Sequence, residues 1–491
     1  MTSLDPAPAY ATQSGPLTAW LFCRALGAIY VIAFLSLLVQ IGGLIGDQGI
    51  LPAGEFLTAV RQVYGADAYR LLPTVAWFAN STRALQVWCG AGVVCGLLLL
   101  AGRATRPALI GAFILYLSML AVGQVFLSFQ WDSLLLEAGA LAFVATFWPA
   151  AGAWLFRWLI FRLLFLSGAV KIVSGDPNWR DLTALTYHFQ TQPLPNVVSW
   201  YVQQAPHAVL VAGSVVTFLA ELAVPLLFFA GRRVRLAGAI ATVTFQAMIF
   251  LTGNYTFFNL LTVALALWLL DDARISGWLP RRFLPIVAPR DSVPRGWRRY
   301  VLIGVMAILL TSSTTQAWQA LGGRTPPQLD ALLGAIEPLR LTSSYGLFAV
   351  MTTTRPEIIF EGSDDGRTWQ PYEFKYKAGD LRRAPAFVAP YQPRLDWQLW
   401  FAALGDPRTD RWVLAFAARL LQAQPAVLDL LRASPFGARA PRYVRATLYD
   451  YHFTTRVERA ATGCWWARRQ IGEYLPPLTL DGSTLRPATL P

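Results

Sequence analysis

The sequence predicts a polytopic α-helical membrane bundle followed by a C-terminal antiparallel β-domain that is sandwich-like and carries a helical insertion. Two observations predict this fold class. Apolar residues make up 55% of the chain and charged residues only 14%, whereas soluble domains carry about 25% charged residues. The apolar residues gather in long stretches before residue 321, and residues 340–491 have a more mixed composition.

Nine apolar stretches are candidate membrane spans, because crossing the hydrocarbon takes roughly 17–25 residues. They cover about residues 20–42, 84–102, 107–128, 133–150, 154–173, 207–230, 236–252, 256–270 and 300–321. Together they predict a transmembrane domain at 20–321 with about nine spans, preceded by an N-terminal tail at 1–19.

Arginines predict the orientation of this domain. The short connections at Arg103–Arg106, Arg232–Arg235 and Arg274–Arg299 all fall on one side, as positively charged cytoplasmic loops do. The tail 1–19 is then cytoplasmic and the domain at 340–491 extracytoplasmic. The protein would lie in a bacterial inner membrane if bacterial, or in the endoplasmic reticulum membrane if eukaryotic. The same loops account for much of the net charge of +13 without any nucleic-acid partner.

The C-terminal domain is predicted from turn and strand signals. Strand-forming residues are dense in Ser344–Thr353, Glu357–Glu361, Pro371–Tyr376, Tyr443–Thr455 and Cys464–Tyr474. Residues Ser363–Gly366 read as a turn. The segment Arg411–Leu431 is predicted to be one or two helices with a break near Pro425.

Five charged residues stand out within the predicted spans: Arg24, Glu137, Arg162, Lys171 and Glu221. Each costs about 2.5–3.5 kcal/mol on insertion scales, so each needs a partner or a purpose. Depth and sign predict that Glu137 pairs with Lys171, and Glu221 with Arg162 or Arg24. These groups are either ion pairs that hold the bundle together or a polar site that opens outward.

The predicted outer loop 174–206 is rich in aromatic and polar residues, among them Trp179, Asp181, His188 and Gln192. Interfacial anchoring is one reason for such a composition. Asp176, Asp181 and His188 lack the close ligand spacing of a metal site, so neither a metal nor another cofactor is expected. The sequence also lacks the nucleophile elbow, the zinc-protease motif and the phosphate loop.

Several long segments resemble the lipase maturation factor family. In the predicted bundle they are Gly43–Pro52, Gln130–Gly139, Phe161–Lys171, Trp179–Pro195 and Thr252–Asn259, the last of which contains Asn254. In the C-terminal domain they are Tyr345–Ala349, Glu361–Ser363, Tyr372–Gly379 and Pro390–Ala403. The resemblance implies a membrane protein that helps secreted lipases fold and assemble, with its C-terminal domain in the lumen. The implied partners are membrane lipids and a lipase-like exported client.

Three outward segments are expected to converge: loop 174–206, the turn at Trp131–Asp132, and Arg394–Phe401 with Asp396 and Trp397. The combined surface would be a client site, with His188, Asp132, Arg394 and Asp396 at its polar positions. Alternatively, the segment Arg394–Phe401 is a corner that packs the β-domain against the bundle.

The main alternative function is a membrane enzyme whose active site lies at the outer membrane face. It would use Lys171, Glu137, Asp132 and His188, and a deep polar cavity beneath loop 174–206 would favour it. The plan of a helical bundle followed by an outer β-domain is similar to that of vitamin K-dependent carboxylase-like proteins, at the level of architecture alone. A transporter is disfavoured because the sequence lacks inverted repeats.

Overall fold

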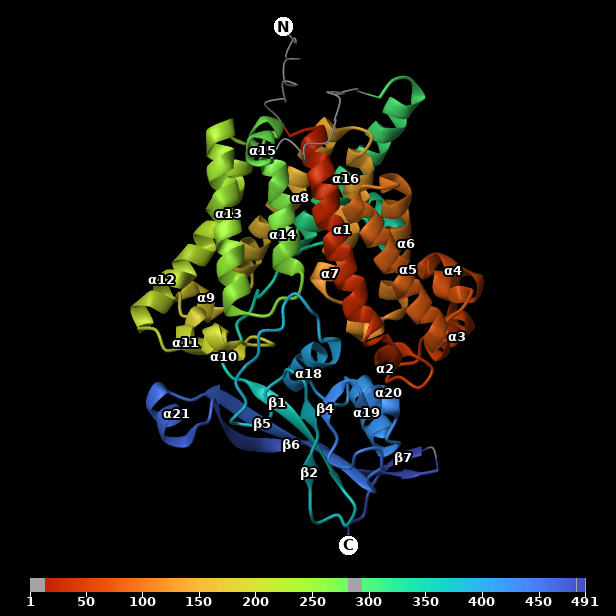
Figure 1. The fold of residues 1–491 in the computed structure, drawn as a ribbon, viewed down its shortest axis with the longest axis vertical. Helices are drawn as coiled ribbons and strands as arrows, with labels where there is room; N and C mark the ends of the chain where they lie inside the picture. The colour runs from red at the N-terminus through yellow and green to blue at the C-terminus, as the bar shows by residue number, and fades with distance from the viewer. Residues whose placement is uncertain (1–13, 281–293, 483, 491) are drawn as a thin grey trace.

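A computed structural model describes residues 14–280, 294–482 and 484–490, and shows a helical bundle with a β-domain packed against one end (Figure 1). Most of the predicted tail 1–19 and the middle of the Arg274–Arg299 cluster lie outside the described residues. The antiparallel β-domain and its helices follow the bundle in the chain, as predicted.

Six helices in the described part of the chain are long and apolar enough to cross a membrane. They are α1 (Pro16–Leu38), α5 (Thr82–Ala101), α6 (Thr105–Val122), the helical segment His207–Phe229, α13 (Arg232–Thr252) and α16 (Trp297–Ala320). The segment His207–Phe229 is irregular, since α12 (His207–Phe218) runs into a π-helical turn, η4 (Leu219–Ala223), and a 3₁₀ segment, η5 (Val224–Phe229). These six helices confirm a multi-pass membrane protein.

The other three predicted spans correspond to helices in the middle of the bundle. They are α7 (Gln130–Ala145), α8 (Pro149–Val173) and the pair α14 (Phe258–Ala266) and η6 (Leu267–Leu269). At about 1.5 Å per residue, α7 and the α14–η6 pair are shorter than the hydrocarbon. Helix α8 is 25 residues long but carries Arg157, Arg162 and Lys171. The count of nine spans therefore stays a prediction.

Short helices connect the long ones. Between α1 and α5 lie α2 (Ile41–Ile45), α3 (Ala53–Tyr64), η1 (Gly65–Asp67), α4 (Ala68–Leu71) and η2 (Val75–Trp77). Beside the C-terminal domain lie η3 (Gln124–Leu127), α9 (Pro177–Arg180), α10 (Leu185–Thr191) and α11 (Val197–Gln203). Further along the chain are α15 (Asp272–Trp278), α17 (Pro327–Ile336) and η8 (Glu337–Leu339).

The C-terminal domain is built on a five-stranded antiparallel sheet in the order β2-β1-β5-β6-β7. Its strands are β1 (Pro356–Ser363), β2 (Gln370–Pro371), β5 (Tyr443–Phe453), β6 (Trp466–Asp481) and β7 (Thr484–Pro487). A second sheet holds only β3 (Glu373–Phe374) and β4 (Leu431–Ala433), so the second layer is largely helical. That layer includes α18 (Arg394–Leu404), α19 (Arg411–Leu421) and α20 (Pro425–Leu428); α21 (Arg456–Thr462) connects β5 to β6.

Two predictions about this domain have clear outcomes. The helical insertion at Arg411–Leu431 is confirmed, with its break just before Pro425. The strand predicted at Ser344–Thr353 is wrong, because this segment is an irregular loop whose backbone bonds to side chains of residues 130–176 rather than to another strand.

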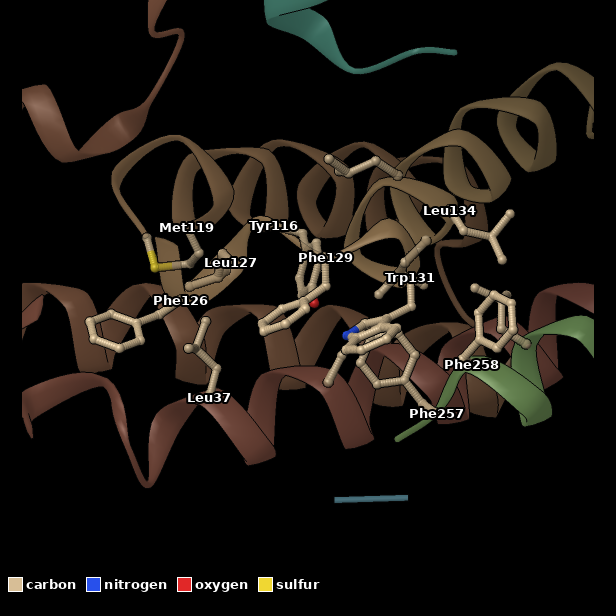
Figure 2. Close-up of a cluster of buried hydrophobic side chains, with 14 of the residues drawn as sticks. Leu37, Tyr116, Met119, Phe126, Leu127, Phe129, Trp131, Leu134, Phe257 and Phe258 are labelled. Carbon is tan, nitrogen blue, oxygen red and sulfur yellow. The ribbon is translucent and has the colours of Figure 1, made fainter. Parts of the chain in front are cut away.

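One hydrophobic core runs from the bundle into the C-terminal domain without interruption. Figure 2 shows part of it, where Tyr116 of α6, Phe126 of η3 and Trp131 of α7 lie close together with Leu37 and Phe257. The ring of Phe126 packs edge-on against Trp412 of α19, with centroids 5.5 Å apart. The two parts therefore fold against each other as one packed body.

Candidate functional site: the joint between bundle and C-terminal domain

We call the interface between the helical bundle and the C-terminal domain the joint. At its centre, Arg394 of α18 meets Asp132 at the start of α7. The two guanidinium nitrogens donate to the two carboxylate oxygens at 3.0 and 2.9 Å, and both side chains are fully buried. The hydroxyl of Tyr116 donates to the same carboxylate at 2.5 Å, and Arg394 also donates to the carbonyl of Phe126 at 2.7 Å. A bidentate pair of this kind fixes the orientation of both partners.

Aromatic rings surround this ion pair. Trp131 stacks on Phe129 and meets the edge of Trp397, with both centroid distances at 4.8 Å. The indole of Trp400 donates to the carbonyl of Thr191 in loop 174–206 at 2.9 Å. The three segments predicted to converge therefore do converge.

They meet in the interior rather than on a surface. The side chains of Asp132, Arg394, Asp396 and Trp397 are all buried. Asp396 accepts hydrogen bonds from the backbone amides of Tyr376 and Lys377, so it organises the C-terminal domain from within. Its burial raises the pKa of this carboxyl above its ordinary value. The corner interpretation of Arg394–Phe401 fits this geometry, because a client protein has no access to these polar groups.

A loop at residues 342–351, which we call the strap, leads from the last membrane helices to β1 and lies along α7 and α8. Glu137 of α7 pairs with Arg162 of α8, and both also hold the strap. The hydroxyl of Tyr345 donates to Glu137 at 2.6 Å, and Arg162 donates to the carbonyl of Ser343 at 2.9 Å. The ion pair thus fastens the strap as well as the two helices.

Lys171, near the end of α8, makes the second attachment of the strap to the bundle. Its ammonium donates to both oxygens of Glu221 at 3.1 and 2.8 Å and to the carbonyl of Leu347 at 3.0 Å. Trp179 packs over the ammonium at 5.0 Å and donates to the carbonyl of Phe348 at 2.9 Å. Glu221 lies in the π-helical turn η4, a distortion that is frequent at functional positions.

The predicted ion-pair partners were therefore wrong, although the carboxylates Glu137 and Glu221 are paired. Glu137 pairs with Arg162 rather than Lys171, and Glu221 with Lys171 rather than Arg162 or Arg24. Glu137 lies two turns inside α7, whereas Lys171 lies in the last turn of α8. Arg162 and Lys171 are also nine residues apart, which at about 100° per residue places them on opposite faces of α8. Arg24 donates to the carbonyl of Trp20 on its own helix.

Two side-chain amides, those of Gln192 in loop 174–206 and Asn254 in the turn after α13, also form hydrogen bonds at the joint. Asn254 donates to the carbonyls of Leu194 and Ala386, and accepts from the amide of Val388 at 2.7 Å. It therefore links the bundle, the loop and the C-terminal domain through one side chain. Gln192 donates to the carbonyl of Thr252 and accepts from the hydroxyl of Tyr255, both at 2.8 Å.

His188 faces a cavity beneath α10 and contacts the hydroxyl of Tyr255 at 3.2 Å. Removal from bulk solvent, and secondarily the positive charge of Lys171, lowers the pKa of His188 to about 4, so the ring is neutral at physiological pH. Asp181 lies apart from all these residues. It is exposed and pairs only with its neighbour Arg180 among the described residues.

Sequence reasoning missed Arg355, which lies just before β1. It donates to the carbonyls of Gln190, Gln192 and Pro193, at 2.8, 2.5 and 3.0 Å, and pairs with Glu357 at 2.7 Å. Gln40, which accepts from the backbone amide of Arg394, was missed as well. Asp176 was considered only as a metal ligand, and it accepts from the backbone amide of Met351. The sequence did offer a signal for Arg355, because it is a charged residue within a stretch that otherwise favours β-strands.

The charged groups of the joint are paired with one another and bonded to backbone groups, so the arrangement is suited to holding two parts together. Within the described ranges 14–280, 294–482 and 484–490, no three or more His, Cys, Asp or Glu side chains gather as metal ligands do. The lining of the cavity beneath loop 174–206 is mainly apolar. The enzyme alternative, which called for a deep polar cavity there, is therefore not favoured.

The fold and the joint define a class of protein: a multi-pass membrane protein whose helical bundle is fastened by buried ion pairs to a C-terminal β-domain. Residues 17–277 match the profile of the lipase maturation factor transmembrane domain, and residues 341–476 that of the lipase maturation factor C-terminal domain. The chain belongs to the lipase maturation factor family.

Curated relatives agree over nearly the whole length. The chain is 36% identical to human lipase maturation factor 2 and 34% identical to the chicken (Gallus gallus) protein of that name. These alignments cover 95% of this chain and 83% and 82% of the relatives. It is 34% identical to bovine (Bos taurus) lipase maturation factor 1, over 94% of this chain and 89% of that protein. No solved structure matches the chain.

Proposed function

We propose that this protein is a membrane-bound maturation factor that assists the folding or assembly of exported proteins, with a lipase-like client. The observation that carries the proposal is the near full-length match to curated lipase maturation factors, in both the bundle and the C-terminal domain. The buried, paired charges of the joint support a scaffold in preference to a catalyst. The partners are then a client protein and the lipids around the bundle, with no nucleic acid and no cofactor.

The client surface is expected on the exposed side of the joint, since its polar interior is closed. Phe401 and Leu404 are candidates because they lie three residues apart on one face of α18 and are 43% and 42% exposed. Their helix also carries the buried Arg394, Trp397 and Trp400, so the joint holds this apolar face in a fixed position. Exposed apolar anchors on a rigid support are typical of binding hot spots.

The test is the yield of active client lipase when both proteins are expressed together. The double substitution Phe401→Ala, Leu404→Ala should lower that yield several-fold, since truncating a hot-spot residue costs about 2 kcal/mol or more. The abundance of the protein should stay unchanged, because both side chains lie at the surface. Val457→Ala on α21, which alters a 79% exposed residue of the same domain, is the control. Equal client yields from the double variant and the control would place the client surface elsewhere.

We also propose that the C-terminal domain faces away from the cytoplasm, in the periplasm or the lumen of the endoplasmic reticulum. The arginine distribution around the spans supports this orientation. Cys464 provides the test, because it is partly exposed at the C-terminal end of the loop that contains α21. A membrane-impermeant thiol reagent should label Cys464 from the extracytoplasmic side of intact membranes. Labelling only after the cytoplasmic side is opened would reverse the proposed orientation.

A further inference from the structure

A cavity of about 440 Å³ lies in the end of the bundle nearest the C-terminal domain. Its walls come from helices α8 to α14, from η4 and from the strap. Most of the lining is apolar and includes Leu164, Leu210, Phe245, Ile249 and Phe258. Cavities of about 300–1,000 Å³ with such linings are the usual form of small-ligand sites.

The cavity reaches the outer surface of the bundle between α12 and α13. Four apolar residues line it and are also strongly exposed: Val209 and Val216 on α12, and Met248 and Leu251 on α13. The two helices scarcely touch each other here and diverge in Figure 1. Both belong to segments apolar enough to span a membrane, so the opening faces hydrocarbon rather than water.

The polar groups that line the cavity already have partners. Glu221 is paired with Lys171, and His188 contacts Tyr255. Gln246 accepts a hydrogen bond from the side-chain amide of Asn259 at 2.8 Å. The Lys171 ammonium is fully occupied by Glu221 and by the carbonyls of Ser167 and Leu347. The described lining residues thus offer no free cation to a charged head group, and the Glu221 carboxylate would repel a second carboxylate.

We propose that this cavity holds one acyl chain of a phospholipid from the surrounding bilayer. The chain enters sideways between α12 and α13, and its head group stays outside at the membrane surface. An enclosed free fatty acid fits less well, because its carboxylate would approach Glu221 without a cation to balance it. The strap residues Leu347 and Phe348 form part of the wall, so a bound chain contacts the segment that connects the bundle to the C-terminal domain. The inference is independent of the proposed client.

Photolabelling of the intact protein tests this. The protein is placed in nanodiscs of phosphatidylcholine, a fraction of which carries a diazirine near the end of one acyl chain. After irradiation, the labelled residues are mapped by mass spectrometry. Adducts are expected on the interior residues Leu164, Phe245 and Phe258, as well as on the outward-facing Val243. Adducts confined to outward-facing residues would overturn the proposal.

A matched pair of variants sharpens the result. Val216→Trp puts a large ring at the opening, whereas Val215→Trp makes the same change at an exposed position of α12 that does not line the cavity. Interior labelling should fall about tenfold in Val216→Trp, because excluding even two methylene groups costs that much in affinity. It should persist in Val215→Trp, with labelling of Val243 as the internal reference. Equal interior labelling in both variants would overturn the proposed entrance.

A photoactivatable fatty acid at the same mole fraction distinguishes the two sources of an acyl chain. It should label the interior less than the phospholipid does. Stronger interior labelling by the fatty acid would overturn the assignment to a phospholipid.

Discussion

The joint and the α12–α13 flank of the bundle are built in opposite ways. At the joint, charged side chains are buried and paired, as in Asp132–Arg394, and irregular backbone is held by side chains. At the flank, the helices are apolar on both faces and leave a cavity between them. The joint is organised by polar contacts, whereas the flank has the composition of an ordinary lipid-facing wall.

This difference shows what buried charge does in this protein. Ion pairs cost desolvation energy and often add little net stability, but they specify geometry because each donor must meet its acceptor. The joint needs that specificity, since a loop and a separate domain have to dock in one position on the bundle. The flank needs only an apolar boundary, and apolar contacts tolerate a cavity where a polar network does not.

The largest expected effect is the loss of the central pair. Asp132→Asn should destabilise the folded protein by about 3–5 kcal/mol, because it leaves the Arg394 guanidinium buried without a counter-charge. Arg394→Met should act similarly through the unpaired Asp132 carboxylate. The measurements are the abundance in the membrane and the midpoint of thermal unfolding in detergent.

Asp181→Asn is the matched control, because it removes the same charge from an exposed pair worth only about 0–1 kcal/mol. If Asp132→Asn were as stable as Asp181→Asn, the joint would not depend on its ion pair, and the contrast with the flank would fail.

A smaller effect, of about 1–3 kcal/mol, is expected from a double-mutant cycle on the ion pairs near the strap. Lys171→Met and Glu221→Gln should show strong coupling, since their charged groups lie 2.8 Å apart. Lys171→Met and Glu137→Gln should be nearly additive. Strong coupling between Glu137 and Lys171 instead would contradict the observed pairs and support the Glu137–Lys171 pair predicted from depth alone.

The sequence predicted the elements well because their signals are local. Long apolar stretches and the helix break before Pro425 are properties of neighbouring residues, and the structure shows helices and the break at the expected places. The orientation predicted from the arginine-rich connections stays a prediction. The convergence of Trp131, loop 174–206 and Arg394–Phe401 was also predictable, since all three segments lie on one side in a single topology.

The partners at the joint were not predictable, because pairing depends on the direction in which a residue faces around its helix. Glu137 and Lys171 are similar in predicted depth, but Lys171 points toward Glu221, which lies in the π-helical turn η4. The burial of Asp132 and Arg394 was not predictable either. Charged residues beside aromatic ones have the same composition in a packed corner as on an exposed contact surface.

The strap was missed for a related reason. Its residues favour strands by composition, but no neighbouring strand is available to it. Tertiary hydrogen bonds to Gln130, Glu137 and Asp176 take the place of a sheet, and they come from residues more than 170 positions away in the sequence.

Hydrogen–deuterium exchange of the strap in the intact protein is the most direct measurement of the central claim, that the C-terminal domain is fastened to the bundle through the joint. The amides of Ser343, Gly346 and Met351 lie in a loop, yet each donates to a side chain of the bundle or of loop 174–206. We predict that they exchange far more slowly than the exposed turn at residues 406–410. Asp132→Asn should speed their exchange. Exchange in the wild-type strap as fast as in that turn would contradict the account.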